Sequence, residues 1–245
     1  MKLTNRFAIL IAAFALTCLI SAESVSQDLR GAWKLVNVDG KPADDNVIKI
    51  YSDNYFMFGA YTRDGKFVRA GGGKYAVKGK EYTETADFNT AETSVIRKPV
   101  TQTFTQKNKQ LTLTGNGKKE TWEKVDEGNS KLAGAWRFGA RVNDNGEAGE
   151  RRPSDSPRQT MKILSGKYFQ WAAFNFETKE FSGTGGGTYV LQDDKYTETI
   201  AFFSRDDSKA GISLTFDCKV DGTDWYHKGK GTTGNPVSEV WERVK

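Results

Sequence analysis

The sequence predicts an all-β protein of two tandem antiparallel up-and-down barrels, each of about eight strands. The main observation is an internal duplication: GGGKYAVKGKEYTETADF at residues 71–88 returns as GGGTYVLQDDKYTETIAF at residues 185–202, without a gap. Copies of roughly 100 residues are too long for solenoid units and indicate two domains of one fold. Thr, Tyr, Phe and Val recur along the whole chain, which favours strands. No stretch keeps an apolar period of 3.6 residues over three turns, as a helix would.

The first copy contains eight candidate strands separated by turn sequences. Asp39-Gly40, Asp64-Gly65 and Asn116-Gly117 are pairs typical of tight turns between strands. The segments between turns are rich in β-branched and aromatic residues. They predict strands at Gly31–Val38, Val47–Tyr51, Tyr55–Tyr61, Lys66–Val77, Glu81–Asn89, Val100–Gln106, Gln110–Thr114 and Lys119–Val125.

The second copy repeats this order of strands. Its candidate strands are Gly134–Arg141, Thr160–Leu164, Tyr168–Phe176, Lys179–Leu191, Lys195–Phe203, Ile212–Lys219, Asp224–Lys228 and Val237–Val244. Eight short strands joined mainly by hairpins favour a closed barrel, because closure removes the exposed edges of the sheet.

The domain boundaries follow from the two copies. We expect the first barrel at residues 29–125 and the second at residues 132–245, joined by a short polar linker. The second copy alone carries a polar insertion, Asn143 to Arg158, between its first two strands. This insertion is either a lid over a barrel mouth or a solvated loop, and the sequence leaves both open.

The N-terminus has the features of a signal peptide, which we place at residues 1–22. Lys2 and Arg6 precede an uncharged, mostly apolar segment, and Ile20-Ser21-Ala22 is a small-residue cleavage site. The apolar segment is too short to span a bilayer comfortably, and no comparable run follows, so we expect no transmembrane segment after cleavage. The residues before Cys18 do not resemble a lipobox, which argues against a lipid anchor. We therefore expect export to the periplasm or the exterior.

Charge and cysteine content exclude some classes of protein. The formal net charge is +5, and the basic residues are scattered among acids, so a nucleic-acid partner is not expected. After cleavage Cys218 is the remaining cysteine, so no intrachain disulfide can form. In a strand such a thiol is usually a small buried hydrophobe, although an intermolecular bridge or a reactive thiol stays open. The oligomeric state is not indicated by the sequence.

A family resemblance enters at the first strand of each copy. Gly31-Ala32-Trp33 and Gly134-Ala135-Trp136 resemble the lipocalin signature. The run from Tyr226-His227-Lys228 through Pro236 to Val244 resembles the closing hairpin of an uncharacterised family of bacterial lipocalin-like, calycin-type domains. In lipocalins an Arg or Lys of the last strand packs across the signature indole. The resemblance implies that Lys124 covers Trp33 and that Arg243 covers Trp136, as structural pairs at the closed ends of the barrels. Each copy is shorter than a typical lipocalin and lacks the lipocalin disulfide cysteines.

A glutamate recurs inside the repeated Tyr-Thr-Glu-Thr strand. Strand alternation places one set of side chains on a common face in each copy: Tyr82, Glu84, Ala86 and Phe88 in the first, and Tyr196, Glu198, Ile200 and Phe202 in the second. A buried carboxylate without a partner is costly, so it would recruit a cation or a hydroxyl group. The glutamate is either a polar anchor in an apolar pocket, a structural hydrogen-bonding group, or a residue near the solvated rim. We take Glu198 as the first candidate for ligand contact.

Aromatic side chains are more numerous in the second copy, which is therefore the better candidate for a pocket. They fill the core in most barrels but can also line a ligand site. The candidate ligand-binding residues are Phe169, Trp171, Tyr196, Glu198, Phe202, Trp225 and the single histidine, His227, with Tyr82 and Glu84 in the first copy.

Few features favour an enzyme. A Cys-His dyad would require Cys218 and His227 to meet across a hairpin, and no nucleophile elbow is present. The chain lacks a zinc-ligand cluster, and the glycine triplets lack the spacing of a phosphate loop; in strands such glycines mark bulges or close backbone approach. We assign no catalytic residue, metal or cofactor. The predicted function is an exported lipocalin-like binding protein for a small apolar or amphipathic molecule. The alternatives are an envelope protein-interaction module with packed barrels, and a small-barrel enzyme.

Overall fold

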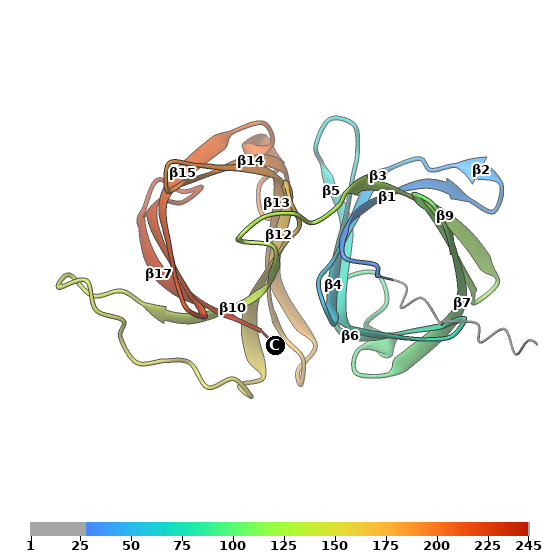
Figure 1. Cartoon of the computed structure of the whole chain (residues 1–245), viewed down its shortest axis with the longest axis horizontal. Coiled ribbons are helices and arrows are strands. Elements are labelled where there is room, and N and C mark those ends of the chain that lie inside the picture. Colours follow the sequence, from blue (N-terminus) through green and yellow to red (C-terminus); the bar gives the residue numbers. More distant parts are fainter. Residues whose placement is uncertain (1–27, 245) are drawn as a thin grey trace, which may run out of the picture.

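Two closed antiparallel β-barrels lie side by side in the computed structural model, which describes residues 28–244 (Figure 1). The predicted all-β fold of two tandem barrels is confirmed. The expected signal peptide and Cys18 lie outside the described residues. The helical elements of residues 28–244 are two three-residue 3₁₀ turns, η1 (Thr93–Val95) and η2 (Asp207–Lys209). Among these residues no helix has the length and hydropathy needed to cross a bilayer.

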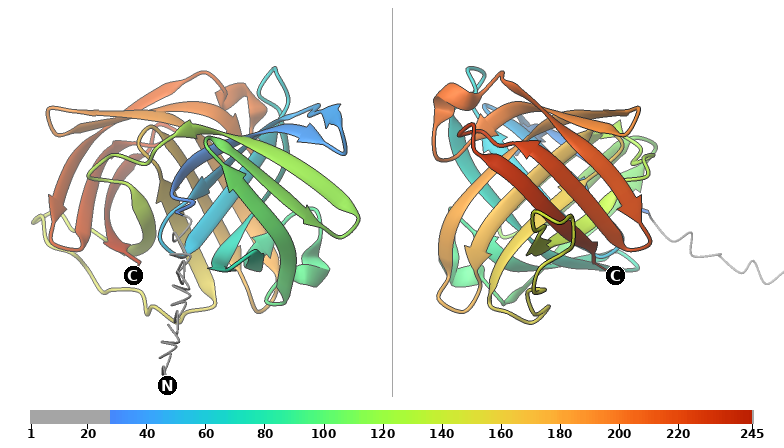
Figure 2. Two further views of the ribbon diagram at one scale, coloured as in Figure 1. Left: turned by 45° about the vertical axis from the view of Figure 1, so that its right-hand side comes forward. Right: turned by 90° about the vertical axis from the view of Figure 1, so that its left-hand side faces the viewer.

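The first barrel closes where β1 pairs with β9. Its strands are β1 (Gly31–Val38), β3 (Asn46–Tyr51), β4 (Tyr55–Tyr61), β5 (Phe67–Lys78), β6 (Glu81–Asn89), β7 (Pro99–Lys107), β8 (Gln110–Gly115) and β9 (Lys118–Asp126). A two-residue strand that the sequence did not indicate, β2 (Lys41–Pro42), pairs with the end of β1. Figure 2 shows the strands running obliquely around each barrel, as closure of a sheet requires.

The second barrel repeats this order and closes between β10 and β17. Its strands are β10 (Gly134–Arg141), β11 (Arg158–Leu164), β12 (Tyr168–Asn175), β13 (Glu180–Gln192), β14 (Lys195–Phe203), β15 (Ser213–Asp221), β16 (Asp224–Lys230) and β17 (Pro236–Arg243). Each strand of residues 28–244 pairs within its own barrel. The insertion between β10 and β11 runs along the outside of the second barrel in Figure 1.

The third glycine of each triplet lies at a β-bulge. The register shifts between Gly72 and Gly73 on β5, and between Gly186 and Gly187 on β13. A Cβ on Gly187 would lie 2.0 Å from the carbonyl oxygen of Thr199, so only glycine allows the two backbones to approach this closely.

This bulge corrects the strict alternation that the sequence suggested. Tyr196 and Glu198 point into the barrel, but Phe202 lies on its outer face, where its ring covers Gly59 of the first barrel. The next residue, Phe203, takes the inner position instead. Phe202 is therefore part of the contact between barrels and does not line the interior of the second barrel.

The contact between the barrels is apolar and nearly symmetric. Phe88 stacks on Phe174 and Phe181, with ring centroids 4.9 and 6.1 Å away. At the equivalent positions of the other copy, Phe202 stacks on Tyr61 and Phe67, at 5.2 and 6.0 Å. Each barrel thus offers the same patch to the other, which is the arrangement of an isologous homodimer. The buried residues around these rings include Ile50, Met57, Ala135, Met161, Ile163 and Ala172.

Candidate functional site

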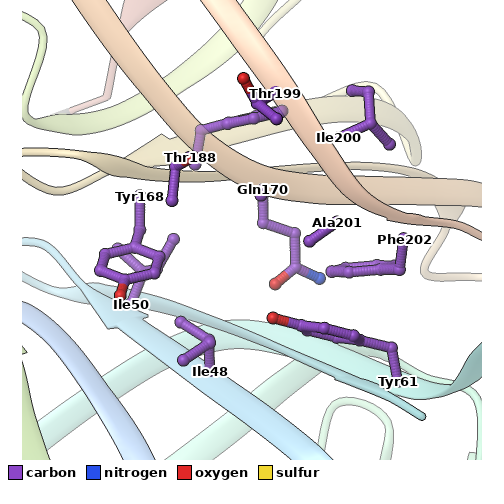
Figure 3. A pocket seen from close by; sticks show the side chains of 12 residues that line it. Ile48, Ile50, Tyr61, Tyr168, Gln170, Thr188, Thr199, Ile200, Ala201 and Phe202 are labelled. Carbon is purple, nitrogen blue, oxygen red and sulfur yellow. The ribbon is translucent and has the colours of Figure 1, made fainter. Parts of the chain in front are cut away.

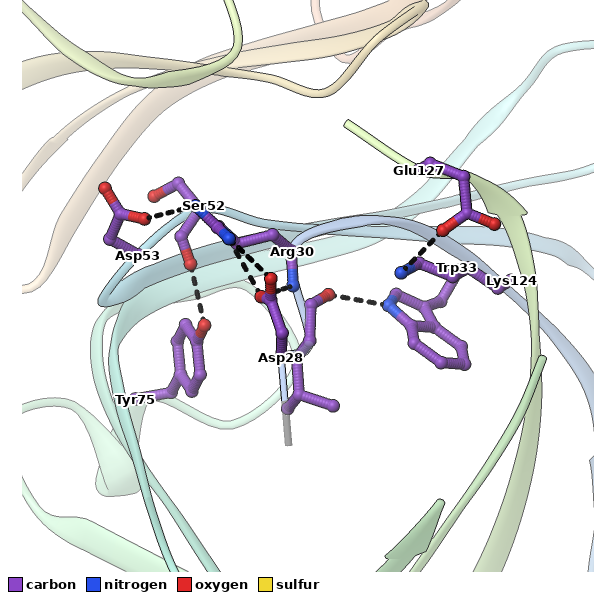
Figure 4. Close-up of polar contacts among 9 residues, drawn as sticks. Asp28, Arg30, Trp33, Ser52, Asp53, Tyr75, Lys124 and Glu127 are labelled. Atoms are coloured by element: carbon purple, nitrogen blue, oxygen red, sulfur yellow. Dashed lines mark hydrogen bonds and ion pairs between the residues drawn. The ribbon is translucent and has the colours of Figure 1, made fainter. Parts of the chain in front are cut away.

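Each barrel is closed at one end by its signature tryptophan and a cation of the last strand. Lys124 Nζ lies 5.4 Å from the centre of the Trp33 ring, and Arg243 Cζ lies 4.1 Å from that of Trp136. The indole of Trp33 donates a hydrogen bond to the carbonyl oxygen of Leu29, 2.8 Å away (Figure 4). Both indoles are fully buried and fill these ends of the barrel interiors. A cavity of about 540 Å³ lies outside them, beside Lys124, among Asp28, Arg30 and the linker between the barrels.

A buried lysine–glutamate pair lies at the middle of each barrel. Lys162 Nζ on β11 is 2.7 Å from Glu198 Oε1 on β14, and both side chains are 5% exposed. In the first barrel Lys49 on β3 forms the same pair with Glu84 on β6. Burial lowers the pKa of Lys49, but the negative groups around it, with Glu84 first, together outweigh burial and raise that pKa above its usual value. Lys49 therefore stays charged, and in this pair the ammonium and the carboxylate neutralise each other.

Aromatic rings enclose both lysines. The ammonium of Lys162 lies 5.2–5.7 Å from four ring centres, which belong to Phe169, Tyr196, Trp225 and Trp241. The ammonium of Lys49 is enclosed in the same way by Tyr51, Phe56, Tyr82 and Trp122. These contacts are at cation–π distance and make each pair part of a packed layer across its barrel.

The tyrosines of the repeated strand belong to this layer. The Tyr82 hydroxyl donates to Glu84 Oε1 and lies 3.0 Å from the Tyr51 hydroxyl. Burial and the Glu84 charge hold the pKa of Tyr82 well above its usual value, and burial raises the pKa of Tyr51 to about 12. Burial and Glu198 likewise raise the pKa of Tyr196. All three tyrosines are neutral near pH 7, and the Tyr196 hydroxyl, unlike the other two, has no hydrogen-bond partner among residues 28–244.

The two barrels differ above this layer. In the first, a cavity of about 450 Å³ opens at the end where β8 turns into β9, opposite the end closed by Trp33. Glu84 lines this cavity and is 22% exposed. Apolar and polar side chains share its wall, including Phe56, Phe58, Val100, Gln102 and Glu120. This volume is in the range of small-molecule sites.

The second barrel is sealed over its lysine–glutamate pair. A cavity of about 670 Å³ lies at its mouth, between Phe138, Trp241 and the inserted segment, but Glu198 does not line it. Glu239 does line it and accepts a hydrogen bond of 3.1 Å from the Trp241 indole. Burial raises the pKa of Glu239, although Lys162 opposes this shift.

The candidate residues of the second copy are therefore brought together inside the barrel, with the exception of Phe202. Phe169, Tyr196 and Trp225 contact Lys162, and Trp171 packs on Phe203 with ring centroids 5.9 Å apart. We expected the better pocket in this copy, but the cavity that reaches a repeated glutamate is the one at Glu84 in the first.

His227 is buried without a polar partner. It stacks on Phe216 with ring centroids 3.9 Å apart, and neither ring nitrogen has a hydrogen bond within residues 28–244. Burial, with a contribution from Lys162, lowers its pKa well below the usual value. Cys218 lies opposite His227 across the β15–β16 pair, and burial raises its pKa. Both side chains are under 5% exposed, so a substrate in solvent would not reach them.

A smaller cavity lies between the barrels. It measures about 100 Å³ and is lined by Ile48, Ile50, Tyr61, Tyr168 and Gln170 among others (Figure 3). It is well below the volume of small-molecule sites, so we interpret it as imperfect packing of the interface.

Sequence reasoning missed the two buried lysines. A lysine in a strand is usually a solvent-facing residue. The signal was present in the duplication: Ile48-Lys49-Ile50 and Met161-Lys162-Ile163 place a lysine between apolar residues at the same point of both copies. A lysine that recurs between apolar residues in both copies, in a chain where a glutamate also recurs, indicates a buried ion pair.

The fold and the two buried layers define a tandem β-barrel protein, and the paired eight-stranded barrels are consistent with a lipocalin-like architecture. Residues 131–245, which contain the second barrel, match the family model of a domain of unknown function (DUF4488). A comparison with curated proteins found no match.

Proposed function

We propose that the protein is an exported, lipocalin-like binding protein whose first barrel takes one small amphipathic molecule. The observation that carries this proposal is the 450 Å³ cavity that descends from the β8–β9 end of the first barrel to Glu84. Export rests on the basic, apolar and small-residue segments of the N-terminal sequence.

The chemistry of the ligand follows from the two oxygens of Glu84. Oε1 accepts hydrogen bonds from Lys49 and Tyr82, whereas Oε2 has no hydrogen-bond donor among residues 28–244. Because the side chain is partly exposed to the cavity, Oε2 is free to accept from a ligand. A hydroxyl or ammonium group meets this requirement, and the apolar part of the ligand would lie against Phe56 and Phe58.

The charge of the wall favours the same ligand. Glu84, Glu92 and Glu120 line the cavity, and Lys118 is the cation at its rim. Lys49 neutralises Glu84 from below. An anionic ligand would face the two remaining carboxylates, so a neutral or cationic head group is preferred.

The proposal can be tested with octylammonium as a probe, by calorimetric titration of the full chain. Glu84→Gln should weaken binding at least tenfold, because the carboxylate is lost while the shape is kept. Glu198→Gln is the matched control in the sealed barrel and should bind like wild type. Val100→Trp places a bulky ring in the cavity, on the strand beside Glu84, and should abolish binding. Equal binding by Val100→Trp would place the probe elsewhere and contradict the proposal.

One observation favours the interaction module as a second candidate. The second barrel is filled by its own side chains around Lys162, so it has no pocket above Glu198. If the first cavity also takes no probe in the folded wild-type protein, this second function is the one supported.

A further inference from the structure

The mouth of the second barrel carries features that the first lacks, all of them from the inserted segment. The insertion folds back on β10: Arg152 N donates to Gly139 O at 2.7 Å, and Gly149 N donates to Arg141 O at 2.9 Å. It thereby forms one wall of the 670 Å³ cavity. This site is separate from the cavity at Glu84 and does not depend on the function proposed for it.

Two of the arginines near this mouth have acidic partners. Arg151 contacts Asp224 at 2.7 Å and Glu242 at 3.0 Å, and Arg137 also pairs with Glu242. The pairs of Arg151 bind the insertion to β16 and β17, and Arg137 joins β10 to β17, so both residues have structural roles.

Arg152 differs from them because it has no acidic partner among residues 28–244. Its guanidinium lies over the Phe138 ring, 4.9 Å from the centroid, and its Nη1 atom is buried without a hydrogen-bond acceptor. Burial and the charge of Arg158 lower its pKa. Because Arg152 lines the cavity and no carboxylate of residues 28–244 pairs with it, an anionic group bound in the cavity would balance its charge.

We propose that Arg152 binds the carboxylate of a small amphipathic acid at the mouth of the second barrel, with the apolar part of the acid on Phe138 and Trp241. A guanidinium fork matches the two oxygens of a carboxylate. Glu150 and Glu239 also line the cavity, and they would repel a dianionic phosphate more strongly than a monoanion. The two barrels then bind different head groups: a hydroxyl or ammonium group in the first and a carboxylate in the second.

The test uses octanoate on the full-length protein, with octanol as the uncharged probe of equal chain length. Octanoate should bind wild type, and Arg152→Gln should weaken it at least tenfold, because the backbone contact to Gly139 is kept and only the guanidinium is lost. Arg63→Gln removes an exposed arginine of the first barrel and should bind like wild type. Octanol binding should be unchanged by Arg152→Gln. Equal octanoate affinity in wild type and folded Arg152→Gln would overturn the proposal.

A second measurement does not depend on the stability of the variant. In an amide NMR titration of wild type with octanoate, the shifts should concentrate at Gly139, Gly149, Arg152 and the Trp241 indole. Shifts confined to the first barrel, to scattered surface sites, or to no residue would also overturn the proposal.

Discussion

Phe67 and Phe181 stack on each other across the two barrels, with ring centroids 6.3 Å apart and planes 13° apart. The two residues occupy the same position of the duplicated sequence, each directly facing the end of the preceding strand. They therefore lie on the local two-fold axis of the interface, where equivalent residues contact each other in an isologous arrangement. The duplication thus joins in one chain two domains that contact each other as the two subunits of a homodimer would.

The second barrel expressed alone should therefore fold and form a homodimer. Residues 132–245 contain a complete ring of strands, but without the first barrel they expose Met161, Phe174, Phe181 and Phe202. A second copy covers that patch with the same geometry. Sedimentation should show a dimer with a cooperative melt, and Phe181→Glu should return it to a monomer. A monomeric wild-type fragment would contradict the isologous interpretation.

The order of the strands could be predicted from the sequence because turn residues and the duplication both mark it. Of the two buried lysine–glutamate pairs, only the glutamates could be predicted. The glutamates recur within a conspicuous motif, whereas Lys49 and Lys162 lie in short strands where alternation alone assigns a lysine to the solvent.

The position of Phe202 could not be derived from alternation, because the bulge opposite Gly187 adds a residue and reverses the faces beyond it. The interface between the barrels could not be predicted from the sequence for a related reason. Strands that face an interior on one side and another barrel on the other are apolar on both faces, and they resemble ordinary core strands.

The Lys162–Glu198 pair should be essential as a pair. Glu198→Gln alone leaves a buried ammonium without its carboxylate and should cost about 3–5 kcal/mol of unfolding free energy. Adding Lys162→Met should recover most of this loss, because a long apolar side chain then fills the aromatic cage. Urea denaturation measures both. A stable Glu198→Gln variant would contradict the charged-pair interpretation.

The two cations over the signature indoles should differ in their contribution to stability. Arg243 lies closer to its indole and also donates to the carbonyl oxygens of Ala133 and Lys131, at 2.7 and 3.0 Å. Lys124 pairs with the exposed Glu127. Arg243→Ala should destabilise its barrel by about 1–2 kcal/mol and Lys124→Ala by about 0.5–1 kcal/mol, measured by denaturant unfolding. The reverse order would show that contact with the indole does not determine how much each cation stabilises its barrel.

His227 should make the protein less stable in mild acid. Its folded-state pKa lies well below the usual value near 6.5, so the unfolded chain binds the proton more readily. As pH falls below about 6.5 towards the folded-state pKa, stability should fall by up to about 1.4 kcal/mol per pH unit. His227→Phe should remove this component and equal or exceed wild type at pH 7. Melting temperatures of both proteins between pH 5 and 7.5 provide the test: parallel curves would contradict the prediction.

The central claim is that the first barrel holds a small molecule in the cavity above Glu84. Native mass spectrometry of the protein purified from its own host, without denaturation, tests this most directly. Val100→Trp fills the first cavity, and Leu214→Trp is its equivalent on β15 of the second barrel, where it serves as the matched control. We predict that wild type and Leu214→Trp carry a non-covalently bound molecule whose mass is missing from Val100→Trp. A bare mass in folded wild type, or the same bound mass in wild type and Val100→Trp, would contradict the account.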